Sequence, residues 1–275
     1  MDKIEKIGNS VIQHGKDSNR IYLMKLNEVD IPDIIEAMEK IAQGNNYTKI
    51  FIKLPESLSE PFIGYGYVIE AKIPFFYNGK EKGFFMAKYL DPSRLKLDHQ
   101  KREEITRNIR IAKSQQIMKS IPENHNYNFR LLKKEDANEL SELYKIVFKS
   151  YPFPIHDPEY IKKTMDENII YFGAMHNDKL VAASSSEMNI DNANVEMTDF
   201  ATNPKYRGNK LALILLDIME KEMSNRNMKT FYTIARSHSA GMNITFARKR
   251  YKFAGTLFNN TNIAGSIESM NVWYK

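Results

Sequence analysis

The feature that most constrains the fold is a strand that runs into a proline, a basic turn and then an amphipathic helix. Residues 194–202 alternate as a strand, and Pro204 ends it because proline has no backbone N–H to donate. The helix that follows has its apolar positions at Leu211, Ile214, Leu215 and Ile218. Free amides at the start of this helix, its dipole and the charges of Arg207 and Lys210 predict an anion site that suits a pyrophosphate. An ordinary turn with exposed basic side chains explains the same residues equally well.

The length of 275 residues favours two domains of ordinary size. The clearest boundary is a polar stretch with a proline at residues 120–126, and we place the domains at residues 1–122 and 123–275. The first is predicted to be a smaller α/β domain, whose role the sequence leaves open. Its strands are expected at residues 21–26, 49–53, 65–73 and 83–90, with a helix that Asp30 caps and a long basic helix at residues 98–119.

The second domain is predicted to have an α+β fold, with a mixed sheet flanked by helices. We expect a strand, two helices, three strands joined by tight turns, a helix, a strand, a short helix and two closing strands. These elements are expected at residues 128–132, 135–149, 158–165, 169–175, 180–189, 194–202, 209–225, 229–235, 240–248, 252–258 and 268–274.

Composition removes several classes of function. The chain has no cysteine, which excludes thiol catalysis, disulfides and cysteine-ligated zinc. Its six histidines include no i, i+4 pair, so we expect no metal. The N-terminus lacks the apolar core of a signal peptide, and the most apolar run, at residues 211–216, is far too short to span a membrane. These features predict a cytoplasmic protein with no membrane partner.

The formal charge of +6, from 40 Lys+Arg against 34 Asp+Glu, leaves two interpretations. Acidic residues are interspersed almost everywhere, which argues against a nucleic-acid partner and suits an enzyme with a polyphosphate ligand. The basic helix could still form a nucleic-acid or partner face, although a solvated helix surface explains its charges too. Those charges are Lys101, Arg102, Arg107, Arg110 and Lys113. The sequence leaves a homodimer open.

The basic turn resembles a known cofactor loop. Its residues Arg207-Gly208-Asn209-Lys210-Leu211-Ala212 are similar to the acetyl-CoA pyrophosphate loop of the GNAT N-acetyltransferase superfamily, whose pattern is Q/R-x-x-G-x-G/A. The first and last positions match, and Lys210 replaces the central glycine. A lysine keeps the backbone amide and adds an ammonium, so we interpret it as a variation of the loop. The resemblance implies acetyl-CoA as co-substrate, bound by this loop and by Phe200, Ala201, Thr202, Asn243 and Phe246.

A narrower resemblance covers nearly the full chain. Residues 236–247, 259–263 and 268–275, together with the N-terminal region, look like the archaeal and bacterial β-lysine N-acetyltransferases. This resemblance implies acetylation of a small-molecule amine, the ε-amine of β-lysine, to give the osmolyte N-ε-acetyl-β-lysine. Related enzymes often use a tyrosine as general acid several residues after the asparagine that corresponds to Asn243. This chain has Arg250 there with Tyr251 beside it, so the acid stays unassigned.

Acetylation of an amine requires a base, because an alkylammonium of pKa ~10.4 must lose its proton before it attacks a thioester. Glu196 lies on the strand that leads to the loop, where some GNAT enzymes hold a catalytic glutamate; an ordinary solvated residue is the alternative. Asp199 falls on the opposite face, or enters the site if a bulge splays the strand as it does in that superfamily. Glu187 is a substitute base or a ligand of the substrate ammonium. Direct attack in a ternary complex is expected, since no cysteine can carry the acyl group.

The acceptor carries a carboxylate and a second ammonium, for which we predict several ligands. Arg236 is the candidate for the carboxylate because guanidinium binds it bidentately, with a surface salt bridge as the alternative. Tyr151 and Phe153 lie in a proline-stiffened loop that either walls the acceptor pocket or packs in the core. Asn260 and Glu268 are further acceptor candidates. Acetylation of another diamine and a catalytically silent acyl-CoA sensor stay open as alternatives.

Overall fold

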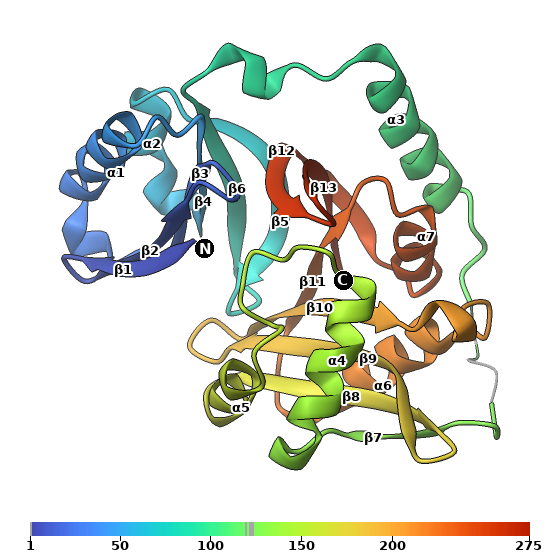
Figure 1. Cartoon of the computed structure of the whole chain (residues 1–275). Coiled ribbons are helices and arrows are strands. Elements are labelled where there is room, and N and C mark those ends of the chain that lie inside the picture. Colours follow the sequence, from blue (N-terminus) through green and yellow to red (C-terminus); the bar gives the residue numbers. More distant parts are fainter. Residues whose placement is uncertain (1, 119, 121–123) are drawn as a thin grey trace.

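One sheet runs through the computed structural model, which describes residues 2–118, 120 and 124–275. Over those residues the sheet has 13 strands in the order β1-β2-β3-β4-β6-β5-β12-β13-β11-β10-β9-β8-β7. The N-terminal half supplies the strands from β1 to β5 in this order, and β5 lies beside β12 at the junction (Figure 1). The predicted domain boundary between Pro122 and Glu123 lies outside the described residues.

The N-terminal half packs the first two of its three helices against its part of the sheet. Its strands are β1 (Lys3–Ile7), β2 (Ser10–Gly15), β3 (Arg20–Lys25), β4 (Lys49–Pro55), β5 (Val68–Tyr77) and β6 (Glu81–Tyr89), and its helices are α1 (Asp33–Gly44), α2 (Ser59–Gly64) and α3 (His99–Lys113). β3 and β4 pair in parallel across α1, as a crossover helix allows. The four predicted strands are confirmed, whereas β1, β2 and α2 are additions.

The start of α1 differs from the prediction. Asp30 does not cap this helix but ends a short 3-10 helix, η1 (Glu28–Asp30). Its carboxylate accepts hydrogen bonds from the Asn9 amide at 2.9 Å and from Ser10 Oγ at 2.6 Å. The Asp30 side chain therefore ties the turn between β1 and β2 to the α1 entry, and α1 begins after Pro32 without a side-chain cap.

The basic helix α3 is shorter than predicted and packs against α7 (Figure 1). Asp98 caps it, with its carboxylate accepting from the Lys101 amide at 2.8 Å. On its inner face, Asn108 Nδ2 donates to the Ser237 carbonyl at 3.0 Å. The helix ends at Lys113, where the chain turns to run beside α7.

The C-terminal half has the predicted mixed α+β architecture. Its strands are β7 (Asn128–Leu131), β8 (Ile169–His176), β9 (Lys179–Asn189), β10 (Asn194–Thr202), β11 (Thr230–Arg236), β12 (Lys252–Ile263) and β13 (Ser266–Tyr274), and its helices are α4 (Ala137–Val147), α5 (Pro158–Asp166), α6 (Leu211–Asn225) and α7 (Ala240–Arg248). Short 3-10 helices lie at Glu56–Leu58 (η2), Pro92–Leu95 (η3), Lys134–Asp136 (η4) and Pro204–Tyr206 (η5). Every element predicted for this half is present, with ends shifted by a few residues.

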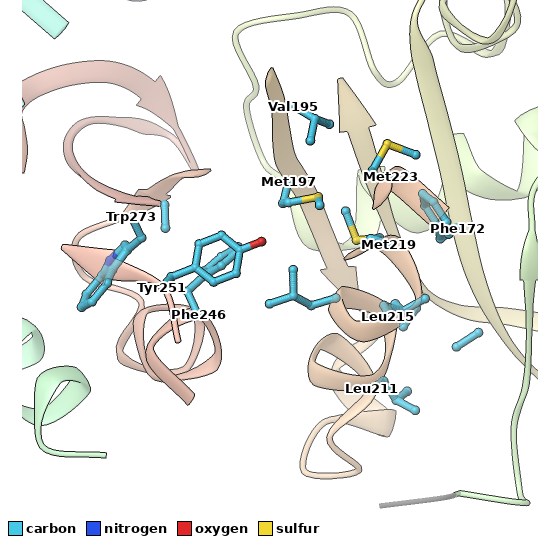
Figure 2. Packing of buried hydrophobic residues seen from close by; sticks show 14 of the residues in the cluster. Phe172, Val195, Met197, Leu211, Leu215, Met219, Met223, Phe246, Tyr251 and Trp273 are labelled. Carbon is cyan, nitrogen blue, oxygen red and sulfur yellow. The ribbon is translucent and has the colours of Figure 1, made fainter. Parts of the chain in front are cut away.

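Two hydrophobic clusters pack helices against this part of the sheet. One holds α6, and the other holds α4 and α5. Figure 2 shows α6 beside β10 and labels side chains of both in one hydrophobic cluster: Val195 and Met197 of β10, and Leu211, Leu215, Met219 and Met223 of α6. Because β10 is anchored in this way, the turn after it is held at a fixed place beside the sheet.

The two halves meet at Gly255 of β12, which pairs with Ala71 of β5. A Cβ on Gly255 would lie 2.0 Å from the Glu70 carbonyl oxygen, so this close approach requires glycine. A shared core covers the junction on one side. Its buried members come from both halves and include Phe51, Phe85, Tyr232, Leu257 and Val272.

Candidate active site

A cavity of about 930 Å³ opens where β10 and β11 separate. The two strands are in parallel register only over Asn194 to Glu196. Beyond this point β10 continues toward the basic turn, while β11 pairs with β13. The N-terminal half closes part of the cavity with residues of β3 and β4: Arg20, Tyr22, Met24 and Phe51.

A bulge in β10 places Asp199 in this cavity. The register with β9 shifts between Thr198 and Ala201, and Asp199 has a φ of 53°. The Asp199 carboxylate accepts hydrogen bonds from Ser185 Oγ at 2.6 Å and from the Tyr151 hydroxyl. Of the two positions that the sequence left open for Asp199, the structure has the one inside the cavity. Burial raises the pKa of this carboxyl, and its hydrogen bonds oppose the rise.

Two glutamates stand opposite each other on neighbouring strands. Glu196 is the register partner of Glu187 on β9 and of Tyr232 on β11, and both glutamates line the cavity. Like charges in directly opposite positions repel each other. Lys53 of β4 brings a positive charge to this row, because its Nζ donates to the Tyr232 hydroxyl at 3.0 Å and Tyr232 is the register partner of Glu196.

These charges set the ionisation of Glu196. Burial raises the pKa of Glu196 to about 7, with Lys53 opposing the rise and Glu187 adding to it. Burial also raises the pKa of Glu187, again against Lys53. For Lys53 burial alone would lower the pKa, but the nearby tyrosines and carboxylates outweigh it and raise the pKa well above its usual value. A carboxylate with a pKa close to neutrality is suited to act as a general base at pH 7.

The basic turn lines the same cavity through Arg207, Gly208 and Lys210, and the first turn of α6 adds Leu211 and Ala212. Gly208 has a φ of 88°, and no described atom lies within 4 Å of the position that a Cβ would take. Lys210 has a φ of 59°, the left-handed conformation that glycine adopts without strain. The lysine therefore holds the backbone shape that a glycine would give, at the N-terminus of a helix where an anion is favoured.

On the acceptor side, Arg236 lines the cavity but already has a partner. Its Nε and Nη2 donate to the two carboxylate oxygens of Glu268 at 2.8 and 2.7 Å. Two residues predicted as separate substrate ligands therefore bind each other. Tyr151, Phe153 and Asn260 line the cavity, whereas Glu268 is not among the lining residues. Tyr151 and Phe153 also pack against the hydrophobic cluster of α4 and α5, so both interpretations of their loop stay open.

The Asn243 side chain is buried in the protein and does not line the cavity. It is fully buried, and its Oδ1 accepts from Asn271 Nδ2 at 2.9 Å and from Trp273 Nε1 at 2.8 Å. Its Nδ2 donates to the carbonyls of Arg236 and Ser239. The side chain thus fixes the loop before α7, and the predicted direct contact with the cofactor arm does not fit this placement.

The other predicted cofactor contacts divide in the same way. Phe200, Thr202 and Phe246 line the cavity, and the rings of Phe200 and Phe246 pack edge to face at 5.5 Å. Ala201 is buried in the α4–α5 cluster. Asn209 stabilises the turn, with Nδ2 donating to the Tyr206 carbonyl at 2.9 Å. Ala201 and Asn209 therefore have structural roles, in the core and in the turn respectively.

Comparison with known proteins decides the family. A family model described as the acetyltransferase (GNAT) family matches residues 139–249. The β-lysine N(6)-acetyltransferase of Methanococcus maripaludis is 41% identical over 275 residues, which cover 100% of this chain and 99% of that protein. The chain belongs to the GNAT acetyltransferase family.

Two further relatives of this acetyltransferase also extend over its N-terminal half. The N-acetyltransferase YodP of Bacillus subtilis is 33% identical over 97% of this chain and 95% of its own length. The β-lysine N(6)-acetyltransferase of Methanosarcina mazei is 30% identical over 88% of this chain and 96% of its own length. The similarity therefore includes the half that supplies Arg20 to the cavity and Lys53 to the Tyr232 hydroxyl.

As a GNAT acetyltransferase the chain uses acetyl-CoA, whose thioester supplies the acetyl group. The residues of the basic turn fit its diphosphate, because Arg207 and Lys210 bring two positive charges to the N-terminus of α6. The left-handed backbone at Gly208 and Lys210 leaves the turn open toward the cavity. Within the described residues, β10 has no register partner on its β11 side beyond Glu196, so the β10 backbone beyond this point is not paired with β11.

The sequence alone missed the acetyltransferase residues that come from the N-terminal half. Lys49, Phe51 and Lys53 alternate on one face of a predicted strand, and a phenylalanine between two lysines on one face indicates a buried polar surface. That pattern does not reveal which partner covers the face. Arg20 and Tyr22 likewise share one face of β3, the strand that pairs with β4.

The basic helix α3 of the acetyltransferase lies outside this site. It does not contribute to the cavity lining, and its Lys101 forms a surface ion pair with Asp98, with Nζ 3.7 Å from the carboxylate. Over residues 2–118, 120 and 124–275, no group of three His, Cys, Asp or Glu side chains could hold a metal ion. In the same part of the chain, no helix is long and apolar enough to cross a membrane.

Proposed function

We propose that this acetyltransferase transfers the acetyl group of acetyl-CoA to the ε-amine of β-lysine and yields N-ε-acetyl-β-lysine. The observation that carries the proposal is the cavity that joins the basic turn to the half-buried pair Glu187 and Glu196. The names of two relatives that match the chain over most of its length support β-lysine as the acceptor. The product would serve as a cytoplasmic osmolyte.

In this mechanism Glu196 removes the proton from the amine. At pH 7 an alkylammonium with a pKa of ~10.4 loses its proton at a cost of about 4–5 kcal/mol. A carboxylate whose pKa is about 7 accepts that proton far more readily than water does. Glu187 and Asp199 line the same cavity and hold the ammonium beside the base. The amine then attacks directly in a ternary complex, since the chain has no cysteine to carry the acetyl group.

The basic turn binds the other substrate in this proposal. Arg207 and Lys210 neutralise the diphosphate, and the amides at the start of α6 donate hydrogen bonds to it. Backbone amides near Phe200 stabilise the negative charge that develops on the thioester oxygen. Phe246 and Phe200 form an apolar side of the cavity that suits the pantetheine arm.

The test is transfer of labelled acetyl from acetyl-CoA to β-lysine, with the acetylated nitrogen assigned by NMR. The wild type should acetylate the ε-nitrogen, and Glu196→Gln should lower kcat by about 10²- to 10⁴-fold without changing acetyl-CoA affinity in calorimetry. Glu142→Gln is the matched control, because Glu142 is an exposed glutamate that pairs with Lys145 on α4. Equal activity of Glu196→Gln and wild type would remove Glu196 as the base.

The same assay separates the alternative functions. A higher kcat/KM for lysine or a polyamine than for β-lysine would assign a different diamine as the acceptor. Binding of acetyl-CoA without transfer to any amine would indicate an acyl-CoA sensor. Light scattering on the same preparation determines whether the chain is a homodimer.

A further inference from the structure

A buried arginine from the N-terminal half lines the cavity without an anionic partner. Arg20 of β3 is 4% exposed, and its hydrogen bonds to described residues come from Nη1 alone, to the Asn260 carbonyl at 2.7 Å and to Thr261 Oγ1 at 2.9 Å. Within the described part of the chain, Arg20 Nε and Asn260 Oδ1 have no partner, although both residues are at least 96% buried. A buried guanidinium without a counter-charge is costly. These unused groups beside a cavity point to a ligand.

The unused edge of Arg20 has the geometry that binds carboxylates. Nε and Nη2 lie on one side of a guanidinium, and Arg236 holds both oxygens of Glu268 through this same pair of atoms. Arg94 provides a contrast, since it is 7% exposed and donates from Nε, Nη1 and Nη2 to neighbouring oxygens. Arg20 therefore keeps the capacity for a bidentate anion that Arg94 and Arg236 have already used.

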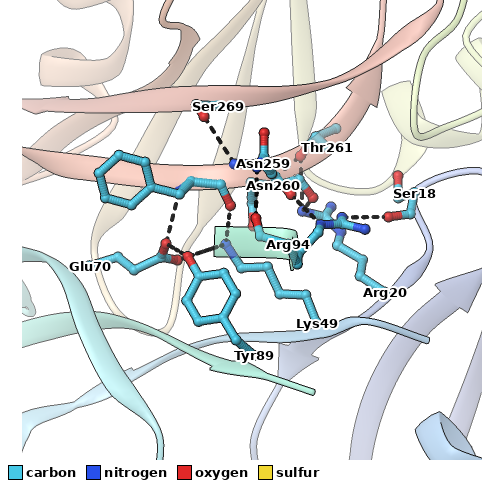
Figure 3. A network of polar contacts seen from close by, with 11 residues as sticks. Ser18, Arg20, Lys49, Glu70, Tyr89, Arg94, Asn259, Asn260, Thr261 and Ser269 are labelled. Atoms are coloured by element: carbon cyan, nitrogen blue, oxygen red, sulfur yellow. Dashed lines mark hydrogen bonds and ion pairs between the residues drawn. The ribbon is translucent and has the colours of Figure 1, made fainter. Parts of the chain in front are cut away.

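A polar network fixes the position of Arg20 (Figure 3). The register of β12 shifts between Leu257 and Thr261, and carbonyls in this bulge accept hydrogen bonds from cations of the N-terminal half. Three consecutive carbonyls do so: Phe258 from Lys49 Nζ at 2.8 Å, Asn259 from Arg94 Nε at 2.7 Å, and Asn260 from Arg20 Nη1 at 2.7 Å. The guanidinium of Arg20 is thus held in place before any ligand arrives, which lowers the entropy lost on binding.

The cavity carries a positive and two acidic side chains near Tyr22. Arg20 lies two residues before Tyr22 on β3, about 7 Å along the same face, and its guanidinium carbon is 5.4 Å from the ring centroid. Lys53 Nζ lies 5.4 Å from the centroid of the same ring and donates to the Tyr232 hydroxyl at 3.0 Å. Tyr232 is the register partner of Glu196, so the carboxylate pair lies near this ring as well. A ligand with a carboxylate at one end and an ammonium at the other matches this arrangement.

We propose that Arg20 binds the carboxylate of an amino-acid acceptor whose distal amine lies at Glu196, and that Asn260 Oδ1 accepts a hydrogen bond from the second ammonium of that acceptor. This assignment rests on the proposed acetylation of β-lysine, and it gives the carboxylate to Arg20 instead of Arg236. It also gives the N-terminal half a role in specificity. A diamine that lacks a carboxylate leaves the buried guanidinium unpaired, so the site selects against it.

The test compares β-lysine with 1,4-diaminopentane, which is β-lysine without its carboxyl group. The wild type should prefer β-lysine, and Arg20→Gln should lower kcat/KM for β-lysine by roughly 10- to 100-fold, mainly through KM. The same variant should leave kcat/KM for diaminopentane and KM for acetyl-CoA unchanged. Arg236→Gln is the matched comparison, since Arg236 lines the same cavity and is already paired. It should keep the preference for β-lysine.

Several outcomes would overturn the proposal: an unchanged preference in Arg20→Gln, a rise in its KM for acetyl-CoA, or loss of the preference in Arg236→Gln instead. If Arg20→Gln does not fold, Asn260→Asp tests the same point, because a carboxylate beside Arg20 should compete with the substrate and raise KM for β-lysine alone. A wild type that uses both amines equally well would also refute the proposal. If the wild type instead acetylates another amino acid, the function proposed above fails, and the comparison is made with that amino acid and its decarboxylated counterpart.

Discussion

Replacing Lys53 with methionine should move the acid limb of the pH–rate profile upward by about two pH units. Methionine keeps the length and flexibility of the side chain but removes its charge. The Lys53 ammonium donates to the Tyr232 hydroxyl over 3.0 Å, and Tyr232 lies opposite Glu196 in the register of β10 and β11. Lys53 lowers the pKa of Glu196, which an opposite charge does over separations of up to about 6 Å.

The expected size follows from this separation. Two unit charges about 6 Å apart interact by about 3 kcal/mol at an effective dielectric constant near 20, which equals about two pKa units. Lys53 lowers the pKa of Glu196, so its loss should raise that pKa from the wild-type value of about 7. At pH 7 the base is then mostly protonated, and kcat/KM should fall by about 50-fold.

The assay is the initial rate of CoA release with β-lysine between pH 6 and pH 10. The amines of the substrate titrate at the same pH with both enzymes, so their effect cancels when the two profiles are compared. Lys88→Met is the control, because Lys88 is a partly buried lysine that pairs with Glu39 at 2.5 Å and does not line the cavity. An acid limb that stays at its wild-type position in Lys53→Met would refute the idea that this lysine sets the ionisation of Glu196.

Three further predictions concern stability. Glu196→Gln should be more stable than the wild type by up to about 3 kcal/mol at pH 8, with no difference near pH 4. The pKa of Glu196 is raised from 4.5 to about 7 in the fold, so ionisation of this carboxyl destabilises the folded wild type as the pH rises. Urea unfolding at the two pH values measures the difference. Lys210→Gly should stabilise the fold by about 1 kcal/mol by relieving a positive φ while raising KM for acetyl-CoA, and a lower melting temperature would contradict it. Gly255→Ala should lower the melting temperature by at least about 5 °C because its Cβ meets the Glu70 carbonyl, whereas Gly241→Ala has open space and should not.

The elements of the C-terminal half were predictable because their signals are local. The short helix at residues 240–248 and the strand at residues 194–202 have the predicted bounds, since an amphipathic period or an alternating run is complete within each segment. β1 and α2 were missed for the corresponding reason. β1 is an exposed edge strand of alternating charges, and α2 is a short helix with Pro61 inside it, so neither presents a clear period.

The site residues also fall into those that a local sequence signal predicts and those that depend on distant partners. The basic turn was visible because its glycine, its two cations and the following helix are contiguous. The bulge at Asp199 could be offered only as one of two alternatives, because a single strand does not show where its partners diverge. Arg236 was assigned to a substrate carboxylate from its chemistry, and the sequence contained Glu268 without showing that the two side chains meet.

The charged residues on the inner strands of the N-terminal half explain why that half belongs to the active site. A buried cation is stable only with partners, and those of Lys49, Lys53 and Arg20 include the Phe258 carbonyl, the Tyr232 hydroxyl and the Asn260 carbonyl of the other half. The contact from Arg20 to Asn260 spans 240 residues of sequence, beyond the reach of any local pattern. Docking the two halves gives Lys49 its partners but leaves the Nε–Nη2 edge of Arg20 without a partner in the described chain. The junction is therefore a structural interface and, under the proposed function, also one wall of the acceptor site.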